Sequence, residues 1–221
     1  MMIVNDSVKT LSNEALAKYR AVDPATIGHI RHFGFPSVDF RTSIPGARAI
    51  GRAVTLRVPS MDSTLCHKVP EYLGPGDILL IDRAGEMNYA CLGGVVAYAL
   101  KLTGVEAVIL DGAATDIQEI RDYGLLVYYR RLSAITTRIL GQDGEINTTI
   151  NCGGAVVRPG DIVVADENGF VVLPPDEAEE ILEAALERQA TEPLKQEELK
   201  NGKRLADISK AGEYIRAKLG K

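Results

Sequence analysis

Residues 91–122 constrain the fold more than any other part of the chain. A glycine pair, Gly93-Gly94, precedes a stretch whose apolar residues recur at helical spacing. Gly104 ends that stretch, as glycine commonly does past a helix C-terminus. The apolar run 107–110 then predicts a strand buried on both faces, which is typical of a parallel sheet. This order predicts a helix–strand–helix unit of an α/β fold.

The same unit suggests a binding site at one end of its strand. Asp116 starts the second helix, and Glu119 follows at the spacing of a capping box. Gly93-Gly94 would present unpaired N–H groups to an anion, and Asp116 would lie past a strand end, where open α/β sheets bind ligands. We expect a metal-assisted site for a carboxylate substrate. A plain glycine turn with an ordinary N-cap Asp is the alternative that these residues leave open.

Composition limits the classes of protein to consider. A chain of 221 residues with 46% hydrophobic and 25% charged residues is typical of one soluble domain, which we expect over residues 1–221. The net charge of -5 argues against direct nucleic-acid binding through a basic surface. We also expect no membrane span, because no apolar run approaches about 20 residues. Three widely spaced cysteines fit neither a disulfide framework nor a zinc site, which favours a reducing cytoplasm.

Two segments resemble each other, 75–82 and 159–166. Each starts with Pro-Gly-Asp, continues as a short apolar strand and ends in an aspartate that we expect to form a turn, Asp82 or Asp166. Asn168-Gly169 predicts a tight hairpin directly afterwards. From about residue 176 to 221 the chain reads as a charged helical extension. Its scattered apolar residues suggest packing against another subunit.

Segment 60–69 is a polar connection that could edge a crevice. It contains Asp62, Ser63 and His67, but no nucleophile-elbow pattern supports a hydrolytic triad.

Several blocks together resemble one known family over most of the chain. They are residues 44–58, 74–82, 92–116, 144–147 and 152–174. In order and spacing they resemble the RraA-like family. That family includes the 4-hydroxy-4-methyl-2-oxoglutarate / 4-carboxy-4-hydroxy-2-oxoadipate aldolases and the regulator of ribonuclease E activity. The resemblance implies an α/β/β/α fold like the swivelling phosphohistidine domain, here with a C-terminal helical extension. It also implies a homotrimer, or a hexamer of two trimers, with sites between subunits.

The resemblance also implies a metal site. In the aldolases Mg²⁺ or Mn²⁺ is held by an Asp and waters, binds a small oxo acid and stabilises the pyruvate enolate, as suits a hard cation. Asp116 matches the metal Asp, and Glu192 matches loosely an acidic residue that approaches the neighbouring subunit's metal through water. The loop whose backbone binds the substrate carboxylate corresponds to Leu92, Gly93, Gly94, Val95 and Val96.

Two positions depart from the aldolase pattern, and both concern the chemistry. Thr115 stands where the family has an Arg beside the metal Asp, so it is a catalytic and substrate-binding position without the cation. Gly94 stands where the aldolases have an acidic residue that supports the metal's water shell. The sequence therefore predicts a metal-dependent lyase of the 4-hydroxy-2-oxo acid aldolase or oxaloacetate decarboxylase type. The alternatives are a related metal enzyme with different chemistry, because of Thr115, or a non-catalytic regulator that binds a ribonuclease.

Overall fold

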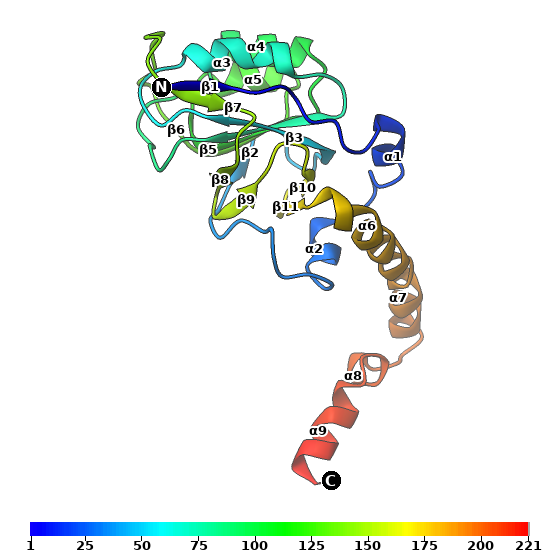
Figure 1. Cartoon of the computed structure of the whole chain (residues 1–221). Coiled ribbons are helices and arrows are strands. Elements are labelled where there is room, and N and C mark those ends of the chain that lie inside the picture. The colour runs from blue at the N-terminus through cyan, green and yellow to red at the C-terminus, as the bar shows by residue number, and fades with distance from the viewer. Residues whose placement is uncertain (221) are drawn as a thin grey trace.

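The computed structural model of the chain describes residues 1–220. Its body is layered in the order helices, sheet, strands, helices, from top to bottom in Figure 1. The first layer holds α3 (Thr64–Lys68), followed by the 3₁₀ turn η1 (Val69–Tyr72), with α4 (Gly94–Leu102) and α5 (Ile117–Asp122). The last layer holds α2 (Pro24–Ile27) and α6 (Pro175–Ala190), with α1 (Asn13–Ala17) beside them. The predicted α/β/β/α architecture is confirmed.

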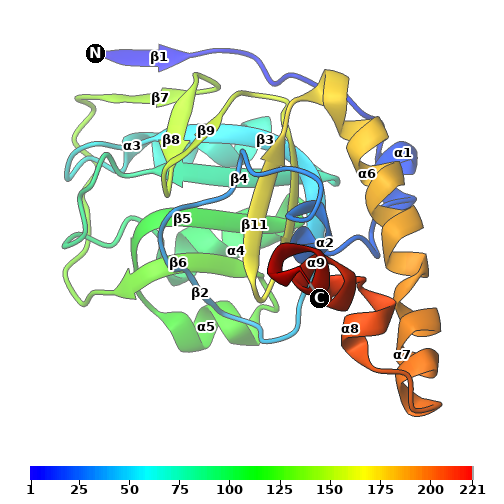
Figure 2. The same cartoon turned by 90° about the horizontal axis from the view of Figure 1, so that it is seen from below.

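The central sheet is built on four parallel neighbours. They are β3 (Ala49–Arg57), β4 (Asp77–Asp82), β5 (Ala107–Ala114) and β6 (Val127–Leu132). Beyond β3 lie β7 (Gly144–Ile146) and β1 (Met2–Val4), and beyond β6 lies β2 (Arg41–Thr42), an order that Figure 2 shows. Because the four strands are parallel, their carboxyl ends share one edge, where α/β sheets place ligands.

A second β layer covers the other face of this sheet. The strand β10 (Ile162–Asp166) pairs antiparallel with the first half of β3, from Ala49 to Arg52, and with β11 (Gly169–Leu173). The hairpin of β8 (Ile150–Cys152) and β9 (Ala155–Val157) lies beside it. On its β7 side, β3 therefore pairs through Leu56 and Arg57 only, because β10 occupies the rest of that edge.

Three apolar cores separate the layers, and alternation along the strands explains them. In β4, Leu79 and Ile81 face the core under the helices, whereas Ile78 and Leu80 face the core under the second β layer. The third core lies between the β10–β11 hairpin and the last helices, where Leu182 of α6 is fully buried. Covered on both faces, β4 is wholly apolar between its two aspartates, as a parallel strand in such a sandwich must be.

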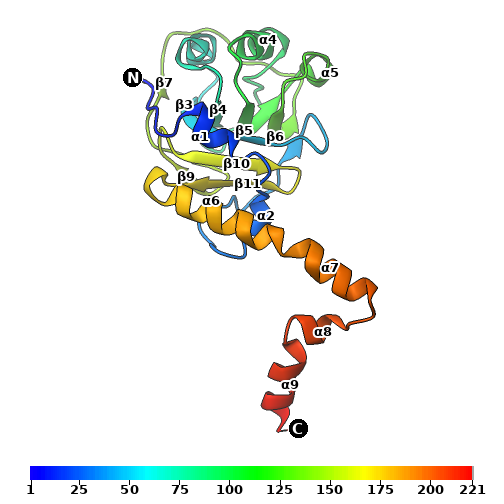
Figure 3. The same ribbon diagram turned by 90° about the vertical axis from the view of Figure 1, so that its right-hand side faces the viewer.

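The C-terminal helices behave in two ways. Helix α6 buries Ala178, Leu182 and Ala185 against the body. By contrast, α7 (Glu192–Lys200), α8 (Leu205–Ile208) and α9 (Ala211–Leu219) bury no residue and project away from it, as Figures 1 and 3 show. The predicted helical extension is confirmed. No helix within residues 1–220 combines the length and apolar character needed to cross a membrane.

Several local predictions can be compared with the structure. The two Pro-Gly-Asp segments become β4 and β10, which flank β3 on its two sides. Their final aspartates form turns as expected, since Asp82 accepts from the Ala84 N–H at 2.6 Å and Asp166 from the Asn168 N–H at 2.8 Å. The hairpin at Asn168-Gly169 is confirmed. Residues 135–139 form no strand, but Thr136 and Arg138 make isolated bridges to Ala90 and Asp62.

Candidate functional site

The loop before α4 is tied to the end of β5. Leu92 forms an isolated parallel bridge with Ala114, and its carbonyl accepts the Thr115 N–H at 2.9 Å. Between Leu110 and Ala113 the pairing of β5 with β6 shifts register, a β-bulge of the kind that re-aims a strand end beside functional sites. The loop and the residues after β5 therefore hold each other in place at the carboxyl edge of the sheet.

Asp116 bridges this junction. It lies between β5 and α5 in the left-handed backbone region, with φ of 51°, a strain of about 1–3 kcal/mol for a non-glycine residue. The Gly94 N–H donates to its Oδ2 at 2.9 Å, and the Thr115 hydroxyl donates to its Oδ1 at 3.2 Å. The capping-box prediction is wrong, because Asp116 makes no side-chain cap to its own helix. Its carboxylate instead caps α4, the preceding helix in the sequence.

The glycine pair leaves room for this arrangement. A Cβ on Gly93 would lie 2.8 Å from Asp116 Oδ2 and 3.0 Å from Thr115 Cγ2, so a side chain there would displace the carboxylate. The N–H of Ala97 donates to the Gly93 carbonyl at 2.9 Å. Val95 and Val96 lie in the first turn of α4, where a helix has no acceptor of its own for its N–H groups. Two donors therefore lie next to Asp116 at the positive end of the helix.

A pocket of about 190 Å³ opens onto these groups. Its lining combines the loop, the residues after β5, the start of α3 and a facing segment, as follows: Ser63, His67, Ala90, Cys91, Gly93–Val96, Thr115, Asp116, Thr136 and Thr137. His67 is exposed and, among the lining residues that the structure describes, is the one side chain able to carry a positive charge. The polar character of segment 60–69 indicates a crevice edge, but nothing in the sequence connects His67 to Asp116.

The predicted site residues fall into three groups. Gly93, Gly94, Val95, Val96, Thr115 and Asp116 come together in this pocket. Leu92 contributes only backbone, because its side chain is buried in the core under the helices. Glu192 lies elsewhere in the same chain, in a cavity of about 350 Å³ with Asp23, His29 and Arg48. Its expected approach to a neighbouring subunit's metal stays a prediction.

A divalent cation of the hard type fits the groups present. Within residues 1–220 no three or more His, Cys, Asp or Glu side chains gather as a metal-binding cluster. Mg²⁺ commonly binds one or two carboxylates and keeps several waters. The exposed Asp116 carboxylate, which lies against Gly93 because that residue has no side chain, suits that mode.

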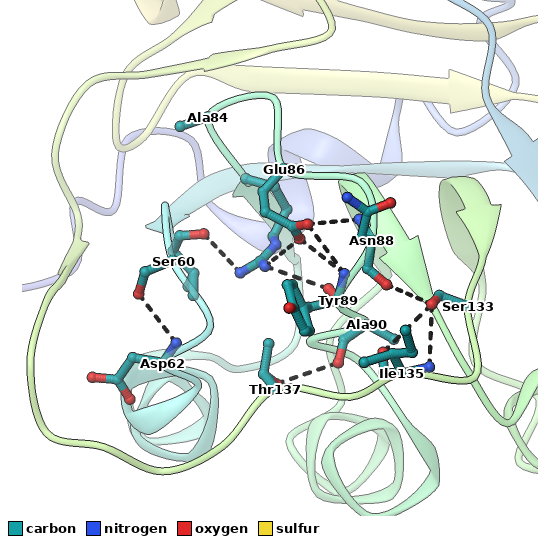
Figure 4. A network of polar contacts seen from close by, with 12 residues as sticks. Ser60, Asp62, Ala84, Glu86, Asn88, Tyr89, Ala90, Ser133, Ile135 and Thr137 are labelled. Atoms are coloured by element: carbon teal, nitrogen blue, oxygen red, sulfur yellow. Dashed lines mark hydrogen bonds and ion pairs between the residues drawn. The ribbon is translucent and has the colours of Figure 1, made fainter.

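A polar network holds the turn that leads to Ala90, a residue of the pocket lining (Figure 4). Arg83 is fully buried and donates to Glu86 at 2.7 Å and to the Val58 carbonyl at 2.7 Å. The other contacts of Glu86, to the N–H groups of Asn88 and Tyr89, shape the turn that leads to Ala90. Burial opposes the charge of Glu86, but the Arg83 hydrogen bond and these N–H groups lower its pKa.

The end of this turn is tied to the facing segment. The Ala90 N–H donates to the Ile135 carbonyl at 2.8 Å, and the Ala90 carbonyl accepts the Thr137 N–H at 3.1 Å. The turn before the loop and the opposite pocket wall are therefore one connected structure.

Two thiols lie behind the wall. Cys66 of α3 and Cys91 are both buried. The interaction with the Cys91 thiol, together with burial, raises the pKa of Cys66. The three cysteines are free, as the sequence predicted.

Comparison with known proteins agrees with this architecture. A model of the Aldolase/RraA family matches residues 27–172. The 4-hydroxy-4-methyl-2-oxoglutarate aldolase of Thermus thermophilus is 36% identical over 132 residues, which are 58% of this chain and 77% of that protein.

Two solved structures are also similar. The RNA-processing inhibitor RraA from Thermus thermophilus is 33% identical with a TM-score of 0.58, and the match covers 63% of this chain and 83% of the other. Streptomyces coelicolor RraAS2, an unusual member of the RNase ES inhibitor RraA family, has a TM-score of 0.75 at 24% identity, covering 86% and 98% of the two chains. The second likeness concerns the fold. Since the family model spans well over half of the sequence, the chain belongs to the RraA-like family.

Proposed function

We propose that the protein is a divalent-metal-dependent carbon–carbon lyase that acts on a small oxo acid. The reaction is of the 4-hydroxy-2-oxo acid aldolase or oxaloacetate decarboxylase type. One observation carries the proposal: the Asp116 carboxylate lies at the N-terminus of α4, where it accepts the Gly94 N–H and lies against Gly93, which has no side chain. The 36% identical Thermus protein named as an aldolase supports it.

Each residue of the pocket then has a role. Asp116 holds the cation, Mg²⁺ or Mn²⁺, which supplies electrophilic stabilisation of charge that develops on the substrate's keto oxygen. The N–H groups of Val95 and Val96 bind the substrate carboxylate at the helix terminus. The Thr115 hydroxyl fixes the Asp116 rotamer through Oδ1 but brings no positive charge. His67 is the lining side chain that can exchange a proton with the substrate.

We also propose that the chain works as one domain, residues 1–221, in a homotrimer or a hexamer. Apolar side chains remain exposed on both sides of the pocket: Val95, Tyr98 and Leu102 of α4, and Ile135 and Ile139 of the facing segment. The arm α7–α9 exposes more of them, including Leu194, Tyr214 and Ile215. A neighbouring copy would cover these surfaces and bring Glu192 toward a second subunit's metal through water. The three free thiols favour the cytoplasm as its compartment.

A second candidate function follows from the other named relative. The RNA-processing inhibitor RraA is 33% identical to this chain, which supports a non-catalytic regulator that binds a ribonuclease. The Thr115 position also supports a third candidate, a metal enzyme of the same family with different chemistry. Both retain the fold and differ from the lyase in what the Asp116 pocket does.

One set of assays separates these candidates. We expect metal-dependent pyruvate release from 4-hydroxy-2-oxo acids or oxaloacetate, and Asp116→Ala should abolish it without unfolding the protein, because Asp116 is exposed. If wild type releases no pyruvate from these acids with Mg²⁺ or Mn²⁺, the lyase proposal fails. Direct association with a ribonuclease that survives Asp116→Ala would then select the regulator.

A further inference from the structure

Two elements that line the pocket each bring a thiol to the same wall. Cys91 is part of the pocket lining and lies two residues before Gly93. Cys66 belongs to α3 and lies in the chain between Ser63 and His67, which also line the pocket. Both cysteines are free and buried in the core under the helices. The thiols are therefore hidden from bulk solvent, and Cys91 is reached from the pocket.

The segment between β6 and β7 fixes the spacing of these two elements. The Ser63 N–H donates to the Arg138 carbonyl at 2.7 Å, and the Thr137 N–H donates to the Ala90 carbonyl at 3.1 Å. Neighbouring residues of one segment thus bind the start of α3 and the start of the loop. Because both elements are held to the same segment, the two cysteines keep their places relative to each other.

The surroundings make the two thiols unequal. The Cys66 thiol and the buried Arg83 guanidinium lower the pKa of Cys91, against the effect of burial. The interaction with Cys91, together with burial, raises the pKa of Cys66. Arg83 has no exposed surface, and within residues 1–220 its Nε has no hydrogen-bond partner. Cys91 is therefore the thiol that a cation favours as a thiolate, and a thiolate is the reactive form of cysteine.

We propose that Cys66 and Cys91 form a reversible disulfide when a small peroxide enters the pocket. The pocket wall is then an oxidation site for hydrogen peroxide, with Cys91 as the attacking thiolate and Cys66 as the thiol that closes the bond. The inference is independent of the proposed function, because it concerns two thiols and needs no metal or oxo acid.

Hydrogen peroxide is the oxidant in both steps. The Cys91 thiolate attacks one peroxide oxygen, so that an S–O bond forms, the O–O bond breaks and hydroxide leaves as water after taking up a proton. The Cys66 sulfur then attacks the sulfur of the Cys91 sulfenic acid. An S–S bond forms, the S–O bond breaks, and the second water leaves with the Cys66 proton. The two thiols lose two electrons and two protons, and one peroxide becomes two waters.

The bond changes the pocket. A disulfide holds its sulfur atoms about 2 Å apart, closer than two thiols in contact. It therefore draws α3 and the loop toward each other. His67 lies one residue after Cys66 and Gly93 lies two residues after Cys91, so both move with the bridge. Transient disulfides of this type are the ones that cytosolic proteins use in redox sensing.

Intact mass measures the reaction without any turnover. Native wild type treated with a small excess of hydrogen peroxide should lose the mass of two hydrogen atoms and keep one of its three thiols for alkylation. Peptide mapping should place the bridge between Cys66 and Cys91, and dithiothreitol should reverse it. The matched control is Cys152→Ser, which removes the third thiol from the core on the other face of the sheet and should form the same bridge.

Single substitutions separate the two roles. Cys66→Ser should stop at a sulfenic acid on Cys91, which dimedone labels. Cys91→Ser should leave Cys66 unlabelled at the same peroxide dose, because its raised pKa keeps it protonated. In native wild type, Cys91 should react with iodoacetamide at least about tenfold faster than Cys152, whose pKa burial raises. Circular dichroism checks that both variants are folded.

The outcomes are distinct from those of the lyase assays. If wild type keeps its mass, or gains oxygen at Cys91 without a bridge, the two thiols do not couple and the inference is overturned. A bridge that includes Cys152 also contradicts it. If either variant does not fold, the wild-type peptide map and its reversal by dithiothreitol still decide. Wild type that forms the bridge but releases no pyruvate refutes the lyase proposal and leaves this inference standing.

Discussion

At the scale of single residues, Asp116 shows how the site differs from an ordinary helix cap. A capping Asp normally accepts N–H groups of the helix it starts. Asp116 has a left-handed backbone and turns its carboxylate to α4 across the loop. The strain is retained because the arrangement leaves one face of the carboxylate open to the pocket.

Thr115 gives the first prediction. Thr115→Arg places a cation beside the substrate's keto oxygen and should raise metal-dependent proton exchange at the pyruvate methyl group. The exchange rate should increase by at most about 10²–10³-fold, which is the usual contribution of one hydrogen-bond donor to an oxyanion. Proton exchange followed by NMR in wild type, Thr115→Arg and Asp116→Ala measures it. Equal exchange in all three would contradict both the metal role of Asp116 and the enolate chemistry.

The second prediction concerns Gly93. Gly93→Ala should displace the Asp116 carboxylate, because the added Cβ would lie 2.8 Å from Oδ2. We expect metal affinity to fall about tenfold, the lower end of what disturbed metal-site geometry costs, with a higher KM for the oxo acid. Gly74→Ala is the control, since its Cβ meets nothing closer than 4.0 Å. Wild-type metal affinity and KM in Gly93→Ala would remove the steric argument.

Much of the site followed from the sequence because its parts are local. The glycine pair, the apolar strand and Asp116 lie within 24 residues, so their meeting depends only on one helix–strand unit. Glu119 and His67 were missed for different reasons. Glu119 stands at a capping-box spacing, and nothing in the sequence indicates that the residue crosses to Gly94. His67 belongs to the connection between β3 and β4. Its position beside the pocket depends on the order of strands in the sheet, which the sequence does not show.

At the scale of elements, the segment between β6 and β7 is held by one buried side chain, Asp62. It accepts the Leu140 N–H at 3.0 Å, the Gln142 N–H at 2.5 Å and two bonds from Thr64. Burial opposes its charge, but these hydrogen bonds win and hold the pKa of Asp62 well below its ordinary value. Part of this segment, Thr136–Thr137, forms a wall of the pocket.

The third prediction follows from that pKa. Because the folded value lies below the unfolded one, the stability that Asp62 contributes is complete above about pH 4 and is lost as the pH falls through the folded pKa. Asp62→Asn should lower the free energy of unfolding by about 2–3 kcal/mol at neutral pH. It should also weaken the loss of stability at acidic pH. Urea unfolding at several pH values measures both effects, with Asp143→Asn, a neighbouring acid on the same segment, as control. If Asp62→Asn loses stability at acidic pH as wild type does, the loss does not come from Asp62.

The layers were predictable because two of the strands are apolar on both faces. The apolar runs of β4 and β10 have no polar face, so each had to lie between two covers. The pairing of β10 with β3 was not predictable, because the partners are more than 100 residues apart. The pattern of apolar residues does not distinguish β10 from any other apolar strand as the partner. Leu102 also shows the limit of periodicity, since it is one of the apolar residues that recur at helical spacing after Gly94 but is 70% exposed.

At the scale of the molecule, the exposed apolar residues beside the pocket and along α7–α9 call for a partner surface. Monomeric proteins rarely leave such patches uncovered. A second copy of the chain would cover them, which is how the proposed trimer accounts for an arm that buries nothing in its own subunit.

The fourth prediction tests this assembly and Glu192 together. Homotrimers of Asp116→Ala or of Glu192→Gln should lose most activity, because every site then lacks one of the two residues. Co-expressed with different tags and purified as mixed trimers, they should recover activity at about a third of the sites, because either kind of mixed trimer has one interface that combines two intact residues from neighbouring chains. Light scattering checks the mass of the mixed assembly. No recovery in mixed trimers of the correct mass would exclude Glu192 from a neighbour's site.

The divided edge of β3 has a consequence for synthesis of the chain. Half of that edge is completed by β7 and the other half by β10, both made more than 80 residues after β3. While the ribosome is still translating the intervening residues, β3 can pair with β4 but presents an open edge on its other side. Unpaired strand edges in nascent chains recruit other strands and aggregate. The emerging protein is therefore open to wrong strand pairing at this edge until its last hairpin closes, after the residues of its pocket have been synthesised.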